Sequence, residues 1–172
     1  MTAHTERLRL GYAPAQVFDV VADVERYPEF MSWVVDARMR RRPDHTFLVD
    51  ITIAAGPLRR RFTTTGVLDR PHRIEVTSND PIFKHYVQRW TFEPTAEGAT
   101  IAECHVEFRL RSHLLHSLMA AAFPRQAAAI ISAFKNRADR LYSTRPALQG
   151  DAGTILLQKS PRSDRTKEIR QE

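Results

Sequence analysis

A few polar side chains within apolar stretches are the groups in this chain that could do chemistry. Tyr86 and Gln88 alternate with Trp90 in one run, and Thr64 occupies a comparable place in an earlier run. In a strand, such residues share a face with their apolar neighbours. Inside a cavity they could orient a bound molecule and exchange protons with it. Tyr27 could add a hydroxyl, although a structural aromatic is the stronger interpretation there.

The histidines and the cysteine do not form a recognisable metal or nucleophile pattern. His113 and His116 are three positions apart, but no carboxylate or third ligand is near them in the sequence. By strand alternation, His85 and His105 fall on the face opposite the apolar residues. Cys104 is the single cysteine, which excludes an internal disulfide and a cysteine-based zinc site. We therefore expect no metal site.

A dense aromatic cluster follows the first predicted helix. Residues 23–33, DVERYPEFMSW, place Tyr27, Phe30, Met31 and Trp33 within seven positions. The segment is predicted to be a short helical turn between a helix and a strand. Such a cluster either plugs the open edge of a curved sheet or forms the mouth of a cavity.

The hydrophobic period divides the chain into a helical start, a block of strands and a helical end. Residues 5–11 alternate as a first strand, and a helix with valines at helical spacing begins at Pro14. Between about 34 and 110 the period is two, in short runs separated by turn residues. Short strands joined by short turns predict an antiparallel meander of six to seven strands.

A long apolar stripe predicts the C-terminal helix. From Leu115 to Leu141, apolar residues recur at intervals of three and four. Because Pro124 removes a backbone donor, we expect the helical run to break or kink there. The prediction is a short helix near 113–122 followed by a long one near 125–142.

Length and composition predict one domain and a tail. The chain has 172 residues, of which 42% are hydrophobic, so it can bury a core. Residues 143–172 lose the hydrophobic pattern and are expected to be a disordered polar and basic tail after a domain spanning 1–142. With no run of 18 apolar residues and no secretory signal, a cytoplasmic protein is expected.

The chain is basic, with a formal net charge of +6. Its arginines cluster at Arg40, Arg41 and Arg42, and again at Arg59, Arg60 and Arg61. The clusters are either solvated strand ends or a surface for a polyanion, such as an anionic bilayer or RNA. No nucleic-acid-reading motif is present and DNA is not expected as a partner, but charge alone does not separate a lipid from RNA.

A long helix lying across a curved antiparallel sheet gives an α+β domain that is filled from two sides. Small residues facing large ones there indicate either tight interdigitation or a void kept open for a ligand, and these residues taken alone favour a solid core. The predicted lining residues from the strands are Phe62, Phe83, Tyr86, Trp90, Val106 and Phe108. Those from the helices and the aromatic cluster are Tyr27, Phe30, Met31, Trp33, Phe123, Ile130, Ile131 and Phe134.

The order of elements resembles the helix-grip fold of START-like lipid-transfer domains. Four blocks carry a closer resemblance, to the family of the coenzyme Q-binding protein Coq10 and the ribosome-association toxin RatA. They are VVADVERYPEFMSWV (20–34), NDPIFKHYVQRWTFEP (79–94), CHVEFRL (104–110) and AFKNRADRLY (133–142). The chain departs from the family at residues 32–34, where relatives often have Pro-Trp-Cys, and at 108–110, where an aromatic-acidic-aromatic triplet is common.

The resemblance implies a cavity that binds an isoprenoid quinone such as ubiquinone, or a similar apolar lipid, without catalysis and without a required cofactor. It also implies a supporting role in respiration and peripheral contact with an anionic inner membrane. Phe30, Met31 and Trp33 could then form a gate beside the helix near Phe123 and Pro124. The arginines could orient that gate on the headgroups.

Two further functions fit the same resemblance. A RatA-like protein would associate with the large ribosomal subunit, and the basic residues suit RNA. Other helix-grip proteins are polyketide aromatase/cyclases, for which Tyr86, Gln88 and Thr64 would be the polar groups. Ligand extraction and ribosome co-sedimentation distinguish quinone binding from ribosome association.

Overall fold

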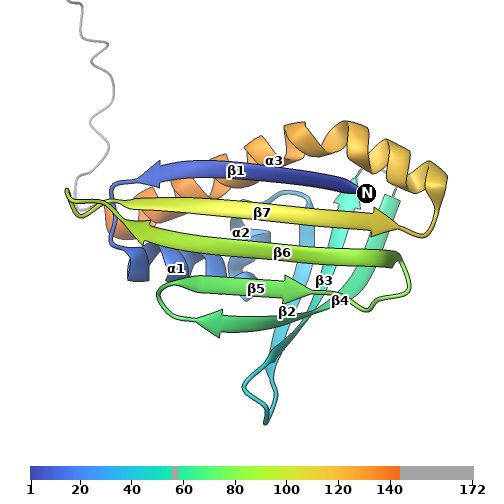
Figure 1. Ribbon diagram of the computed structural model, residues 1–172, viewed down its shortest axis with the longest axis horizontal. Helices are drawn as coiled ribbons and strands as arrows, with labels where there is room; N and C mark the ends of the chain where they lie inside the picture. Colours follow the sequence, from blue (N-terminus) through green and yellow to red (C-terminus); the bar gives the residue numbers. More distant parts are fainter. Residues whose placement is uncertain (56–57, 144–172) are drawn as a thin grey trace, which may run out of the picture.

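A seven-stranded antiparallel sheet forms most of the domain. The computed structural model describes residues 1–55 and 58–143. The strands are β1 (Thr2–Leu10), β2 (Val34–Arg41), β3 (Phe47–Ala55), β4 (Leu58–Asp69), β5 (Arg73–Thr77), β6 (Phe83–Pro94) and β7 (Thr100–Leu110). Their order is β1-β7-β6-β5-β4-β3-β2, so the first two strands of the chain form opposite edges of the sheet (Figure 1). The predicted meander is confirmed.

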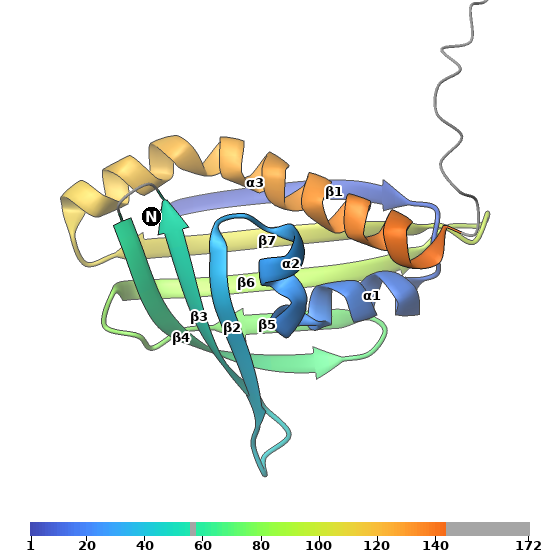
Figure 2. The same ribbon diagram turned by 180° about the vertical axis from the view of Figure 1, so that it is seen from behind.

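Short helices join β1 to β2, and one long helix follows β7. They are α1 (Pro14–Ala22), the 3-10 turn η1 (Val24–Arg26), α2 (Tyr27–Phe30) and α3 (His113–Tyr142). Figure 2 shows α1, α2 and α3 on the same side of the sheet, with α3 running along β1 and β7. This is the predicted α+β helix-grip fold.

The start of α1 follows from its sequence. Pro14 occupies the first turn, where its missing N–H costs nothing, and Ala13 N–H donates to Gln16 Oε1 at 3.0 Å. Val17, Phe18, Val20 and Val21 form the buried face. The ring of Phe18 meets that of Phe92 edge-on, at 5.5 Å between centroids, and so attaches α1 to β6.

The C-terminal helix is continuous, which corrects the predicted break at Pro124. α3 begins at a Ser112 cap, whose hydroxyl accepts a hydrogen bond from Leu115 N–H at 3.3 Å. A proline removes one backbone hydrogen bond and kinks a helix without always ending it. Alanine is the strongest helix former, and three alanines lie on each side of the segment FPRQ.

Strand alternation in β7 is as predicted. Ala102, Cys104, Val106, Phe108 and Leu110 are all buried. They face the helices, and the intervening side chains face outward. The predicted tail after Ser143 lies outside the described residues. Among the helices described here, none has the length and apolarity to cross a bilayer.

Candidate functional site

An apolar cavity of about 190 Å³ lies between the curved sheet and the helices. The inner faces of β2 to β6 form one wall, and residues of α1, η1, the aromatic cluster and α3 form the other. An apolar cavity of about 150 Å³ is large enough to bind benzene. This interior is therefore hollow, with room for about one substituted ring, rather than packed solid.

Many of the predicted lining residues meet at this cavity. They are Tyr27, Met31, Trp33, Phe62, Tyr86, Trp90, Ile130 and Phe134. The helix side is fixed by aromatic packing, since the ring of Phe134 meets Tyr27 at 5.4 Å and Trp90 at 5.3 Å between centroids. α3, the aromatic cluster and β6 thus converge on Phe134.

Other predicted residues lie elsewhere in the core. Val106 and Phe108 are buried on β7, outside the cavity wall. Ile131 lines a separate space of about 10 Å³. Phe83 packs edge-on against Phe62 at 5.4 Å, and so supports the wall without lining it. These placements correct the predicted lining, because the cavity lies nearer to β3 and β4 than to β7.

The aromatic cluster lies against the C-terminal half of α3. The ring of Phe30 lies 5.8 Å from that of Phe134, and the Arg137 guanidinium lies over it at 5.5 Å. Phe30 therefore contacts the C-terminal half of α3. The side chain of Phe123 lies outside the described part of the chain, so the gate stays a prediction. Met31 is only 2% exposed and forms an inner wall.

Most of the contribution of β2, β3 and β4 to the wall was not predicted from the sequence; Phe62 and Thr64 are the exceptions. The unpredicted lining residues of these strands include Met39, Phe47, Val49, Ile51, Gly66 and Leu68. The alternation in residues 47–53 was a usable signal, because every second residue from Phe47 to Ile53 lines the cavity. The two-residue hydrophobic period identifies the apolar face of the strand, but it does not predict that this face encloses a cavity.

Tyr86 and Gln88 bring a hydrogen-bonded polar pair into the cavity wall. The Tyr86 hydroxyl donates to Gln88 Oε1 at 3.1 Å, and Gln88 Nε2 donates to Cys104 Sγ at 3.5 Å. Burial raises the pKa of the Tyr86 hydroxyl, and burial also raises the pKa of the Cys104 thiol to about 12. Both groups are therefore protonated at neutral pH.

The other polar groups at the wall have backbone partners. The Tyr27 hydroxyl donates to the Val21 carbonyl, and burial raises its pKa. The Thr64 hydroxyl donates to the Val49 carbonyl at 3.5 Å. Among the described residues that line the cavity, none is acidic, basic or a histidine. The wall can therefore pack against a ring and hydrogen-bond to an oxygen substituent, but it offers no group that titrates near neutral pH.

The predicted arginines divide between the two faces of the sheet. Arg40 and Arg61 lie on the outer face, where both pair with Asp50, at 2.8 Å and 3.0 Å. A hydrogen bond from Thr63, together with the two arginines, lowers the pKa of that carboxyl. Arg59 shares this outer face by alternation with Arg61.

The remaining arginines of the two clusters do not join that surface. Arg60 is paired in register with Ile53, which lines the cavity, so it projects from the inner face beyond the wall. Arg41 lies over the Phe47 ring at 5.2 Å on the same inner side, and Arg42 follows the end of β2. The two arginine clusters therefore do not form a single face.

The histidines fall where alternation placed them. His85 and His105 are on the outer face, where each lies close to Glu107, at 3.3 Å and 2.9 Å. On α3, the His116 ring packs edge-on against Phe108 at 5.6 Å. Within the described part of the chain, no group of three metal-ligating side chains could hold an ion.

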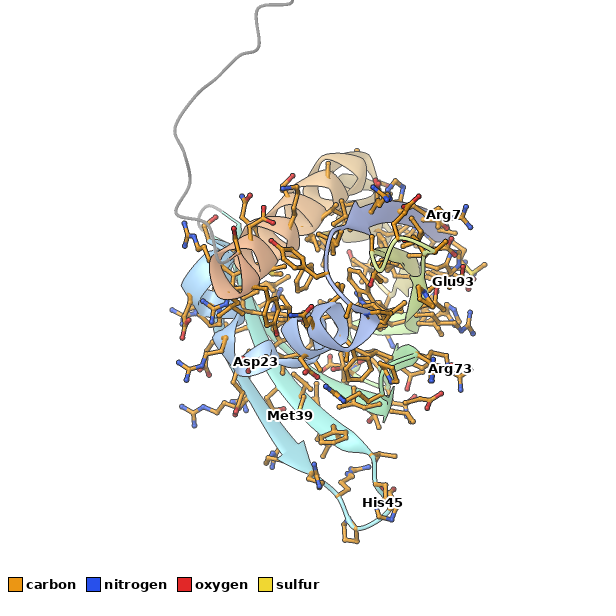
Figure 3. All side chains as sticks on the ribbon, turned by 90° about the vertical axis from the view of Figure 1, so that its left-hand side faces the viewer. Arg7, Asp23, Met39, His45, Arg73 and Glu93 are labelled. Carbon is orange, nitrogen blue, oxygen red and sulfur yellow. The ribbon has the colours of Figure 1, made fainter. Side chains whose placement is uncertain are left out.

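Figure 3 separates the two faces of the sheet. Arg7, Arg73 and Glu93 project from the outer face, away from the helices, whereas Met39 lies on the side of the cavity. A long C-terminal helix gripped by a curved sheet, with an apolar cavity between them, defines a START-like protein. The family model described as polyketide cyclase / dehydrase and lipid transport matches residues 10–135. The chain belongs to this family.

Individual relatives confirm the predicted Coq10/RatA-like group within it. The chain is 31% identical over 143 residues to the ribosome association toxin RatA of Pseudomonas aeruginosa, covering 83% of this chain and 99% of that protein. It is 26% identical over 139 residues to the mitochondrial coenzyme Q-binding protein COQ10 of Dictyostelium discoideum, covering 78% of this chain and 68% of that protein. The solution structure of the 18 kDa protein CC1736 from Caulobacter crescentus is similar to this chain with a TM-score of 0.69 and 32% identity. The match covers 83% of this chain and 99% of that chain.

Proposed function

We propose that this protein binds an isoprenoid quinone such as ubiquinone, or a similar ring-bearing apolar lipid, without changing it chemically. The observation that carries this proposal is the apolar cavity of about 190 Å³, which matches a substituted ring in size. The similarity to a coenzyme Q-binding protein supports the choice of a quinone.

The same volume limits how a long lipid can be held. A cavity sized for one ring does not also enclose a long prenyl tail, and each CH₂ left in water costs about 0.8 kcal/mol. The tail must therefore remain in another apolar medium while the ring is bound. Peripheral contact with a bilayer meets this requirement, and moving a chain from one apolar medium to another changes the free energy little.

The chemistry of the cavity wall supports binding without catalysis. General acid–base catalysis needs a group whose pKa lies near the working pH. The raised pKa values of Tyr86 and Cys104 keep both groups protonated, and no carboxylate or histidine is among the described wall residues. A polyketide cyclase reaction is therefore less well supported than binding.

Extraction of the purified protein tests the proposal. The protein is expressed in a quinone-producing host, purified without detergent and extracted with organic solvent, and the extract is analysed by mass spectrometry. We expect a prenylated quinone in an amount comparable to that of the protein. Extracts with no prenylated lipid, from preparations that are folded by circular dichroism, would contradict the proposal.

Association with the large ribosomal subunit is a second candidate function. It is favoured by the 31% identity to a ribosome association toxin over nearly all of that protein, and by the outer-face arginines Arg59 and Arg61. Sedimentation with purified subunits at several salt concentrations tests it. We expect co-sedimentation that weakens as salt rises. Protein found only in ribosome-free fractions at low salt would rule this function out.

A further inference from the structure

We propose that Tyr86 and Gln88 form a recognition site for an oxygen substituent on the ring of the bound lipid. This inference rests on the proposed binding function and specifies which part of the ligand is recognised. The two residues occupy successive inward positions of β6, and both line the cavity. They place a hydroxyl and an amide in a wall that is otherwise mostly apolar.

The orientation of the pair follows from its hydrogen bonds. Because Gln88 Oε1 accepts from the Tyr86 hydroxyl, the amide nitrogen is directed toward Cys104. The position of Tyr86 is fixed in turn by Phe83, whose ring centroid lies 4.9 Å from its own. The amide is therefore held by partners from two strands, β6 and β7.

The pair has hydrogen-bonding capacity left over. A glutamine amide has two N–H donors, and the one bond from Gln88 Nε2 goes to a sulfur, which is a weak acceptor. No second acceptor for this amide is present among the described residues. The phenolic oxygen of Tyr86 donates its proton and keeps its acceptor lone pairs. One N–H donor and one oxygen acceptor thus remain for a ligand.

These open groups fit the oxygen of a quinone or a quinol. A quinone carbonyl can accept a hydrogen bond from the Gln88 amide. A quinol hydroxyl can do the same while donating to the Tyr86 oxygen. A bare hydrocarbon ring leaves both groups unpaired in an apolar wall, which is unfavourable. The site therefore selects oxygenated rings over hydrocarbon rings, and it admits both redox forms.

Thr64 provides an internal contrast. Its hydroxyl also lies in the wall, but it already donates to the Val49 carbonyl. With its proton committed to the backbone, it cannot donate to a ring oxygen without breaking that bond. Replacing Thr64 with valine keeps the shape and should leave the selection of oxygenated rings unchanged.

Two probes that share a saturated ten-carbon tail test the inference, a ubiquinone with that tail and decylbenzene. Binding is followed by quenching of tryptophan fluorescence, because Trp33 and Trp90 line the cavity. The wild type should bind the quinone about tenfold more tightly relative to decylbenzene, as one to two net hydrogen bonds allow. Gln88→Leu removes the N–H donor and should reduce that ratio to about one. Tyr86→Phe removes the hydroxyl that orients the amide and should lower the ratio, and Thr64→Val should preserve it.

The outcomes separate the two proposals. If the wild type binds both probes with equal affinity, the proposed recognition of a ring oxygen is wrong, whereas the proposed binding of a lipid in the cavity is supported. If Gln88→Leu and Tyr86→Phe keep the tenfold preference, the site is also wrong. If the wild type binds neither probe, the proposed function itself fails. Tyr86→Phe preserves the ring that packs on Phe83, so it tests the site even where Gln88→Leu does not fold.

Discussion

The Tyr12 hydroxyl donates a hydrogen bond to Asp139 Oδ1 at 2.6 Å and joins residues 127 positions apart. Lys135 Nζ donates to the other oxygen of the same carboxylate at 2.7 Å. The Lys135 bond and then the Tyr12 bond lower the pKa of Asp139, and the bond to Asp139 raises the pKa of Tyr12 to about 12. This contact attaches the last turns of α3 to the loop that leads into α1.

Tyr12→Phe should destabilise the protein by about 1 kcal/mol at pH 7, a modest value because the carboxylate is partly exposed. The Asp139 pKa is lowered on folding, so its contribution is present above pH 3.8 and is lost as the pH falls through the lowered value. The raised Tyr12 pKa makes its contribution present below pH 10 and lost as the pH rises through about 12. Urea unfolding across pH measures both, and equal stability of variant and wild type at pH 7 contradicts the prediction.

Phe134→Ala should lower the free energy of unfolding by roughly 3–5 kcal/mol, because it removes a ring that contacts Tyr27, Phe30 and Trp90. Leu141→Ala is the matched control on the same helix, since Leu141 is 50% exposed. We expect the control to change stability by less than about 0.5 kcal/mol. Similar losses in the two variants, measured by urea unfolding, would argue against the central position of Phe134.

Gly66→Val should reduce ligand content without unfolding the protein. Gly66 lines the cavity, and an added Cβ would lie at ordinary contact distances of 3.7 Å from the Glu75 carbonyl and 3.8 Å from Val76. A β-branched residue suits a strand, but its methyl groups would occupy ligand space. Extraction should yield roughly tenfold less lipid, equivalent to about 1.4 kcal/mol of binding. Val67→Ile, on the outer face, is the control and should retain the lipid.

Arg59→Ser and Arg61→Ser should weaken binding to a polyanion, whereas Arg60→Ser should have little effect because Arg60 projects from the inner face. If each outer arginine contacts one phosphate, its loss reduces the slope of log K against log salt by about 0.7–0.9. The measurement is a salt titration with ribosomal subunits or RNA. Equal effects of all three substitutions would show that polyanion binding does not depend on the face of the sheet from which an arginine projects.

Local periodicity was sufficient to predict most of the elements and their order, although not that α3 continues through Pro124. In β7 every second residue from Ala102 to Leu110 is buried, because a strand packed on one face repeats every two residues. The helix from Pro14 was predictable from its valines and its first-turn proline. Both patterns depend only on residues that are close in the sequence, so they can be recognised without knowledge of the tertiary structure.

The position of the cavity was not predictable in this way. Phe47 and Phe108 both lie on apolar strand faces, yet only Phe47 lines the cavity. The difference depends on how far the sheet curves away from α3 at each strand, which is a property of the whole fold. The arginines show the same limit, because Arg60 and Arg61 are adjacent in sequence but lie on opposite faces.

The edge position of β2 has a consequence for self-association. An edge strand carries unpaired N–H and C=O groups that can hydrogen-bond to a second copy of the same chain. Here the edge carries Arg38, Arg40 and Arg41, and an irregularity in its pairing falls between Val34 and Asp36. Like charges and bulged edges oppose such pairing. The arginines of this edge and its irregular pairing therefore oppose the joining of sheets between neighbouring molecules.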